Sequence, residues 1–105
     1  MLIDFTAGIK KITGEVIKNE NKELTLRDVC ASGLLADLEE EKNLSGDEKL
    51  NRYILADRIY KSTEPIELKA EEIAKIKTLV GKSHITLVVG QVYQLLEGQN
   101  GAQTG

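Results

Sequence analysis

The chain has 105 residues, of which 41% are hydrophobic, and this is the size and composition of one compact domain rather than two. Its formal charge of -3 disfavours contact with phosphate backbones unless basic side chains cluster locally. The single cysteine excludes an internal disulfide, and no apolar run approaches the roughly 20 residues that span a bilayer. We therefore expect a cytoplasmic domain without a signal peptide or a membrane helix.

Residues 2–18 have the alternation of apolar and polar side chains that is typical of extended structure. Ile9 and Ile12 precede a turn signal at residues 13–15, and Val16 and Ile17 follow it. This pattern predicts an N-terminal β-hairpin. A two-stranded hairpin is only marginally stable alone, so we expect it to lie against helices.

Lys10 and Lys11 are in this hairpin and are the candidate residues for contact with nucleic acid. Acidic side chains are interleaved with the lysines of residues 4–22, which leaves a local charge of only about +1. A solvated face explains these lysines better, and we do not expect nucleic acid as a partner. A nucleic-acid-associated regulator that uses Lys10 and Lys11 remains the alternative function.

The first helix is predicted from Leu26 to about Leu38. Thr25 can cap its first amides, and Asp28, three residues later, completes a capping box. Apolar residues then recur at three- and four-residue steps, which places Cys30 on the buried stripe. We expect a packed structural thiol there rather than a nucleophile.

A second helix is predicted from Gly46 to Lys61, because Ser45 and Glu48 form another capping box after the acidic run at residues 39–41. Its apolar residues occupy two nearly opposite faces. The main stripe contains five of them: Leu50, Tyr53, Ile54, Ala56 and Tyr60. Leu55 and Ile59 project from the other side. Such a helix is either central in a bundle or covered by a partner molecule on its second face.

Two further helices follow the breaker at Pro65. The third begins with an acidic turn at residues 70–72 and ends at a Gly81 C-cap, and Ser83 opens the fourth. Gly90 is inside the fourth helix, where it indicates a close crossing with another helix. Residues 98–105 are rich in Gly, Gln and Asn and predict a flexible tail.

These elements predict an α+β fold that is mainly α. An N-terminal β-hairpin (2–18) is followed by a compact bundle of about four short helices (25–97), and both belong to a single domain of residues 1–97. No internal repeat is present.

The sequence offers no established pattern for catalysis, metal binding or a cofactor. His84 is the only histidine, and no second His or Cys can join it as a metal ligand. The triplet at residues 81–83 is Gly-Lys-Ser, but Ile76 is where a phosphate-binding loop requires another glycine. After Lys82 the chain has no Lys or Arg, so a helix-turn-helix would lack phosphate contacts.

We therefore expect no catalytic, cofactor-binding or metal-binding residue and no enzyme activity. An enzyme whose site forms only in the folded chain is the remaining alternative. His84 beside an acidic residue in a deep cleft would favour it, whereas His84 on an open surface would not.

Leu55, Ile59 and Leu87 lie off the main apolar stripes of their helices. They either pack against the hairpin or form an interface, and the pattern leaves both interpretations open. A good core without a reactive cluster favours a protein-interaction module, which binds a protein partner or forms a homo-oligomer, with these three residues as its candidate interface.

Three segments carry a resemblance to known proteins. They are residues 24–30 (LTLRDVC), residues 51–60, which begin with NRY and end with IY, and residues 70–82, which begin with AEEI and end with LVGK. They resemble small, functionally undefined proteins of tailed bacteriophages and prophages over nearly the whole chain. The resemblance implies expression in a bacterial cytoplasm, and it also allows a place in the virion. It implies a viral assembly factor, a structural protein or a binder of a host protein, and it carries no site residue across.

Overall fold

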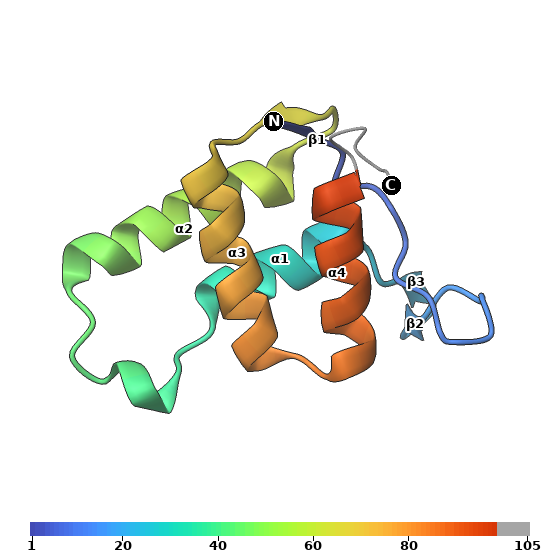
Figure 1. The fold of residues 1–105 in the computed structure, drawn as a ribbon, viewed down its shortest axis with the longest axis horizontal. Coiled ribbons are helices and arrows are strands. Elements are labelled where there is room, and N and C mark those ends of the chain that lie inside the picture. Colours follow the sequence, from blue (N-terminus) through green and yellow to red (C-terminus); the bar gives the residue numbers. More distant parts are fainter. Residues whose placement is uncertain (99–105) are drawn as a thin grey trace.

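The computed structural model describes residues 1–98, and helices dominate it (Figure 1). The helices are α1 (Leu26–Leu35), α2 (Gly46–Lys61), α3 (Ala70–Ser83) and α4 (Thr86–Gly98), with a one-turn 3-10 helix, η1 (Glu39–Glu41). The strands form two antiparallel pairs, β1 (Leu2–Ile3) with β4 (Ile66–Glu67) and β2 (Lys18–Asn19) with β3 (Lys22–Glu23). The predicted class, mainly α with four helices after an N-terminal hairpin, is confirmed. Of the predicted tail, 98–105, only Gly98 lies within the described residues, as the end of α4.

The N-terminal segment contains two successive turns rather than one long hairpin. The predicted turn at residues 13–15 is present, with Lys10 paired to Val16 across it. A second, tighter hairpin joins β2 to β3. Its two turn residues, Glu20 and Asn21, both have positive φ (53° and 70°), as a type I′ turn requires.

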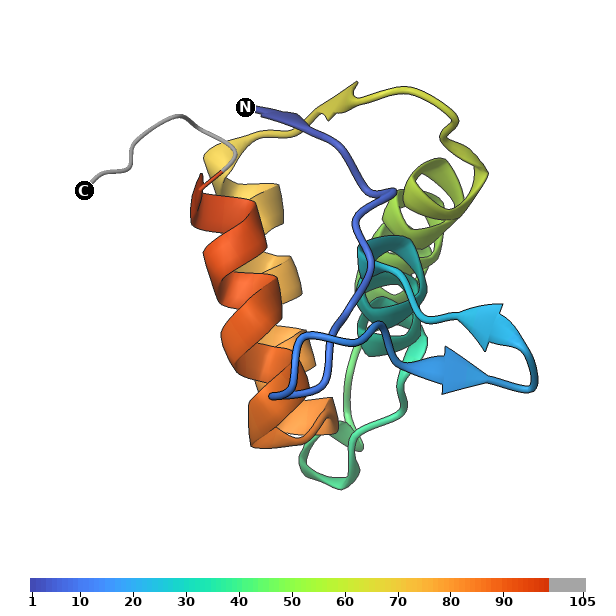
Figure 2. The ribbon, with the colours of Figure 1, turned by 90° about the vertical axis from the view of Figure 1, so that its right-hand side faces the viewer.

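The strand β1 pairs with a segment far along the sequence. Ile3 lies opposite Ile66 in the β1–β4 ladder, and Figure 2 shows the N-terminal strand beside the segment that leads into α3. The prediction of an N-terminal hairpin did not include this long-range pairing. The reason is burial, because Ile3 and Phe5 are 0% and 1% exposed and draw this part of the chain into the core between the helices.

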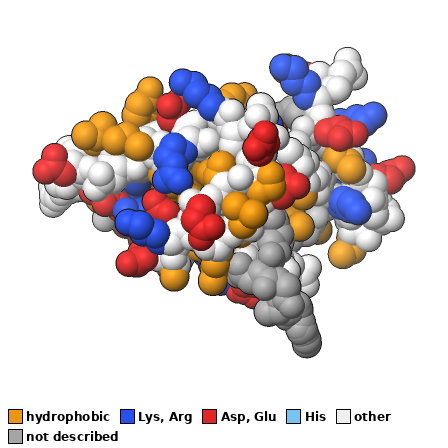
Figure 3. Space-filling model, turned by 90° about the horizontal axis from the view of Figure 1, so that it is seen from above, with side chains coloured by type: hydrophobic (Ala, Val, Ile, Leu, Met, Phe, Trp, Pro, Cys, Tyr) orange, Lys and Arg blue, Asp and Glu red, His pale blue; other side chains and the backbone are white. Residues whose placement is uncertain are grey.

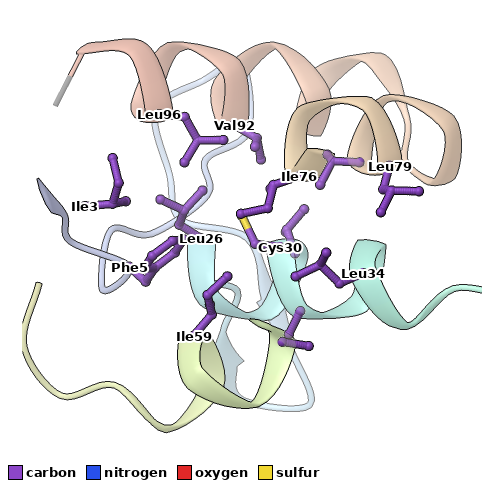
Figure 4. Close-up of a cluster of buried hydrophobic side chains, with 14 of the residues drawn as sticks. Ile3, Phe5, Leu26, Cys30, Leu34, Ile59, Ile76, Leu79, Val92 and Leu96 are labelled. Carbon is purple, nitrogen blue, oxygen red and sulfur yellow. The ribbon is translucent and has the colours of Figure 1, made fainter. Parts of the chain in front are cut away.

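The central helix of the bundle is α1, which contacts α2, α3 and α4. Figure 4 shows its buried side chains between those of two neighbours, with Ile59 of α2 on one side and Ile76 of α3 on the other. Thr25 caps this helix as predicted, since its hydroxyl accepts from the Asp28 N–H and its own N–H donates to the Asp28 carboxylate at 3.1 Å. By contrast, α2 lies at the outside of the bundle (Figure 1).

Three predicted helix ends are wrong. The first helix ends at Leu35 rather than Leu38, because Ala36 turns to extended geometry and donates to the Gly33 carbonyl. The third continues through Gly81 to Ser83, so Gly81 is not a C-cap. Ser83 consequently ends α3 instead of opening α4, and its hydroxyl donates to the Leu79 carbonyl at 2.7 Å.

The close helix crossing is at Gly33 and not at Gly90. A methyl group added at Gly33 would lie 2.9 Å from Val80 Cγ2, whereas one added at Gly90 would meet no atom within 4 Å. The α1–α3 crossing therefore depends on the missing side chain at Gly33.

A buried arginine ties the loop after α1 to α2. Arg52 is 8% exposed and donates to both oxygens of Glu41, at 2.8 and 2.7 Å, and to Glu48 at 2.9 Å. These hydrogen bonds lower the pKa of both carboxyl groups below the usual value. Lys75 of α3 adds a contact of 3.2 Å to Glu48, so the network joins three elements.

Candidate interaction surface

The two apolar faces predicted for α2 are present, but their roles are exchanged, apart from Ala56 of the predicted main stripe, which is in the core. Leu55 and Ile59 are 5% and 0% exposed, so these two candidate interface residues belong to the core. In Figure 4, Ile59 points toward Phe5 and Leu26. Sequence periodicity could not decide between the faces, because both carry large apolar side chains and only the position of α1 selects one of them.

Four large side chains of α2 are exposed on its opposite side, and we call them the outer face of α2: Leu50 (54%), Tyr53 (58%), Ile54 (47%) and Tyr60 (59%). Hydrophobic side chains gather over the end of the molecule that α2 occupies, next to charged ones (Figure 3). This stripe is the expected second face of a helix that is apolar on both sides, and nothing in the described part of the chain covers it.

A groove of about 350 Å³ adjoins the outer face, between α1 and α2. Both helices contribute to its lining, which is mostly apolar: Asp28, Ala31, Ser32, Leu35, Tyr53, Ala56, Asp57 and Tyr60. Leu35 is 55% exposed and continues the apolar surface from α2 to α1. Sequence periodicity did not reveal this groove, because the groove depends on how α1 and α2 pack together. The exposure of Leu35 had no local signal either, since consecutive apolar residues such as Val29 and Cys30 are both buried on the same helix.

The charged residues that line the groove are both acidic. Asp28 is engaged at the start of α1 with Thr25, and Asp57 forms an exposed ion pair of 3.1 Å with Lys61. No Lys or Arg is among the lining residues. The groove is thus an apolar trough with carboxylates at its edges.

The third candidate, Leu87, is half-buried on α4 and does not line this groove. The three predicted interface residues therefore do not form one exposed surface. Two are core residues, and the third is separate from the outer face of α2.

His84 is in the turn between α3 and α4, where it bridges two serines. Its Nδ1 lies 2.9 Å from Ser83 Oγ, and its Nε2 lies 3.0 Å from Ser32 Oγ on α1. Both hydroxyls also donate to backbone carbonyls, Ser83 to Leu79 at 2.7 Å and Ser32 to Val29 at 3.0 Å, so each oxygen can accept from the ring. Burial lowers the pKa of His84, which favours the neutral imidazole at neutral pH.

The distance of 3.0 Å between Ser32 Oγ and His84 Nε2 is in the range found when a histidine activates a catalytic serine. The other groups that acyl transfer requires are missing around this pair. The partner of Nδ1 is a hydroxyl and not a carboxylate. Ser32 is inside α1, where the neighbouring backbone N–H groups are used within the helix and cannot stabilise an oxyanion. The arrangement is suited to linking α1 with the α3–α4 turn.

Cys30 is fully buried on α1, as predicted, and burial raises the pKa of its thiol to about 12. The thiol is therefore protonated at neutral pH and packs as a small apolar group.

Lys10 and Lys11 are exposed, near the turn at residues 13–15. The side-chain amide of Gln91 on α4 bonds the backbone of Lys10 in both directions, which attaches this loop to the bundle. Basic and acidic side chains are intermixed on this end of the molecule (Figure 3). The two lysines are accessible, but they do not add up to a basic stripe.

Within residues 1–98, no three His, Cys, Asp or Glu side chains group closely enough to hold a metal ion. None of the helices in this part of the chain has the length and apolar composition that crossing a membrane requires. Comparison of the chain with protein-family models, with curated proteins and with solved structures found no match. The resemblance to phage proteins therefore stays a prediction.

Proposed function

We propose that this protein is an interaction module that binds a protein partner through the outer face of α2 and the adjoining groove. The observation that carries the proposal is the exposure of Leu50, Tyr53, Ile54 and Tyr60 on one side of a helix whose other side is in the core. A helix at the edge of a bundle normally presents polar residues to water, so an apolar outer face indicates a surface that becomes covered.

The shape of this surface favours a macromolecule over a small ligand. Tyr53 and Tyr60 line the groove, but Leu50 and Ile54 lie outside it on the same helix. The apolar surface is therefore longer than the groove. Tyrosine is enriched at protein interfaces because its ring is apolar and its hydroxyl can bond at the rim.

In the phage or prophage setting that the resemblance implies, the partner would be a virion protein, an assembly factor or a host protein. Catalysis has no part in this proposal. Binding alone would perform the function, by holding a partner in place or by blocking a surface of it.

The test is chemical crosslinking and affinity capture from a bacterial cell that expresses the tagged protein. We expect Leu50→Ser combined with Tyr53→Ser to abolish capture, because the double variant removes two of the four large apolar side chains of the outer face. Ile12→Ser is the matched control, since Ile12 is an apolar side chain of 91% exposure on the distant hairpin loop. Capture that is equal for the three proteins would refute the proposal.

A further inference from the structure

We infer that the occupant of the outer face of α2 is a second copy of this chain, with the two α2 helices antiparallel. This inference rests on the proposed function and names its partner. The contact would be a two-fold symmetric dimer, in which the same surface serves both protomers.

The charges of α2 fit this direction. On the exposed side, its first turn carries Asp47 and its last turn carries Lys61. Glu48 and Arg58 of the same turns are instead held within the chain, by Arg52 and Glu72. An antiparallel pair brings Asp47 of each helix next to Lys61 of the other, and the two-fold axis repeats this contact. A parallel pair would instead oppose acid to acid and base to base.

The exposed side has apolar residues at its centre and charged residues toward its ends. The positions at alternating steps of three and four are Asp47, Leu50, Ile54, Asp57 and Lys61, of which Leu50 and Ile54 are apolar. Such a repeat keeps one line of side chains facing a neighbouring helix. If the two-fold axis passes at Ile54, that side chain meets its own counterpart, and Asp47 lies opposite Lys61 of the other copy.

Lys61 can make this contact by exchanging its present partner, Asp57. It is 74% exposed in its side chain, and its ion pair with Asp57 is also exposed. Exposed ion pairs contribute little to stability and can exchange partners. Tyr53 and Tyr60 flank the seam on the groove side, where Leu35 of α1 extends the apolar contact beyond α2.

The dimer should be weak. The apolar stripe from Leu50 to Tyr60 extends over about 15 Å at 1.5 Å per residue, which makes a small interface. We expect a dissociation constant in the micromolar range, where monomer and dimer coexist.

Sedimentation velocity of the full chain from about 1 μM to about 1 mM tests the association. The sedimentation coefficient should rise with concentration for the wild type. Ile54→Glu should weaken the dimer at least about tenfold, because two carboxylates would meet at the axis. Ile12→Glu, which adds the same charge to the hairpin loop, should leave it unchanged.

Cysteine crosslinking tests the relative direction of the two α2 helices. Only introduced cysteines can form disulfides between copies, because the native Cys30 is buried. A mixture of the single variants Asp47→Cys and Lys61→Cys should form mixed disulfides under mild oxidation, and each variant alone should form few. Bridging requires Cα atoms within about 7 Å, so only an antiparallel pair joins these positions. Disulfides in each single variant, without a mixed product, would show a parallel pair and overturn the inference.

The failure of this inference can be told from the failure of the proposed function. A wild type that stays monomeric at every concentration refutes the dimer. In that case, capture of a different protein by the wild type and not by the double variant at Leu50 and Tyr53 supports the interaction module with another protein as its partner. If capture is also unaffected, both are wrong.

Discussion

Gly33 and Gly90 form a matched pair for testing how the bundle is packed. Both are helical glycines, and both can be replaced by alanine. In α4, Gly90 faces open space, whereas Gly33 is at the crossing of α1 with α3, where an added methyl carbon would lie 2.9 Å from Val80 Cγ2 and 3.3 Å from Val80 N. We expect Gly90→Ala to stabilise the protein and Gly33→Ala to destabilise it.

The magnitude follows from two effects. Replacing a helical glycine by alanine raises the free energy of unfolding by about 1 kcal/mol, and this gain applies to both variants. Gly33→Ala also overpacks the core, at a typical cost of about 1–3 kcal/mol. Val80 is fully buried and close to Gly33 through its backbone as well as its side chain, so a change of rotamer alone cannot relieve the contact. The difference between the two variants should therefore be about 1–3 kcal/mol, since the helix-propensity gain cancels.

Urea unfolding followed by circular dichroism measures this difference directly. For a domain of this size, 1 kcal/mol corresponds to about 4–8 °C in Tm, so thermal melts give an independent check. Val80→Ala should be less harmful in the Gly33→Ala background than in the wild type, because it removes the nearest atom. A Gly33→Ala variant as stable as Gly90→Ala, or the absence of coupling to Val80, would refute the proposed crossing.

Two further predictions concern polar groups. Arg52→Met should lower the free energy of unfolding by about 1–3 kcal/mol, because it removes charged hydrogen bonds to Glu41 and Glu48 from a largely buried site; Arg58→Met, which disrupts a more exposed pair, should cost less than about 1 kcal/mol in the same urea experiment. His84 has a pKa of 6.5 when it is exposed, as in the unfolded chain, and burial lowers this pKa in the folded protein. As the pH falls below about 6.5 the unfolded chain therefore binds a proton at His84 before the folded protein does, and the free energy of unfolding should decrease. In His84→Gln this part of the pH dependence should vanish, and a persisting loss of stability between about pH 7.5 and pH 5 would assign it to other groups.

Mutations on the two faces of α2 should have different effects on folding and on binding. Mutations at Leu55 and Ile59, which the sequence suggested as interface residues, would disturb folding, because both side chains are in the core. Mutations at Tyr53 and Tyr60 change exposed side chains and leave the core contacts in place. Only the second pair can separate binding from stability.

Local rules in the sequence determined the caps, the extent of α2 and the composition of the core. Thr25 and Ser45 could be recognised as N-caps because the groups that they bond are only three residues away. The turn at residues 13–15 and the burial of Cys30 follow equally from short-range patterns. In each case the physical cause is within one or two turns of chain.

The tertiary structure decided everything that depends on distant partners. It paired Ile3 with Ile66, placed the close crossing at Gly33, and joined His84 to Ser32. It also selected which apolar face of α2 is buried, and so which face remains for a partner. Periodicity describes a helix about its own axis, and only the packing of α1 against α2 gives that axis an inside and an outside.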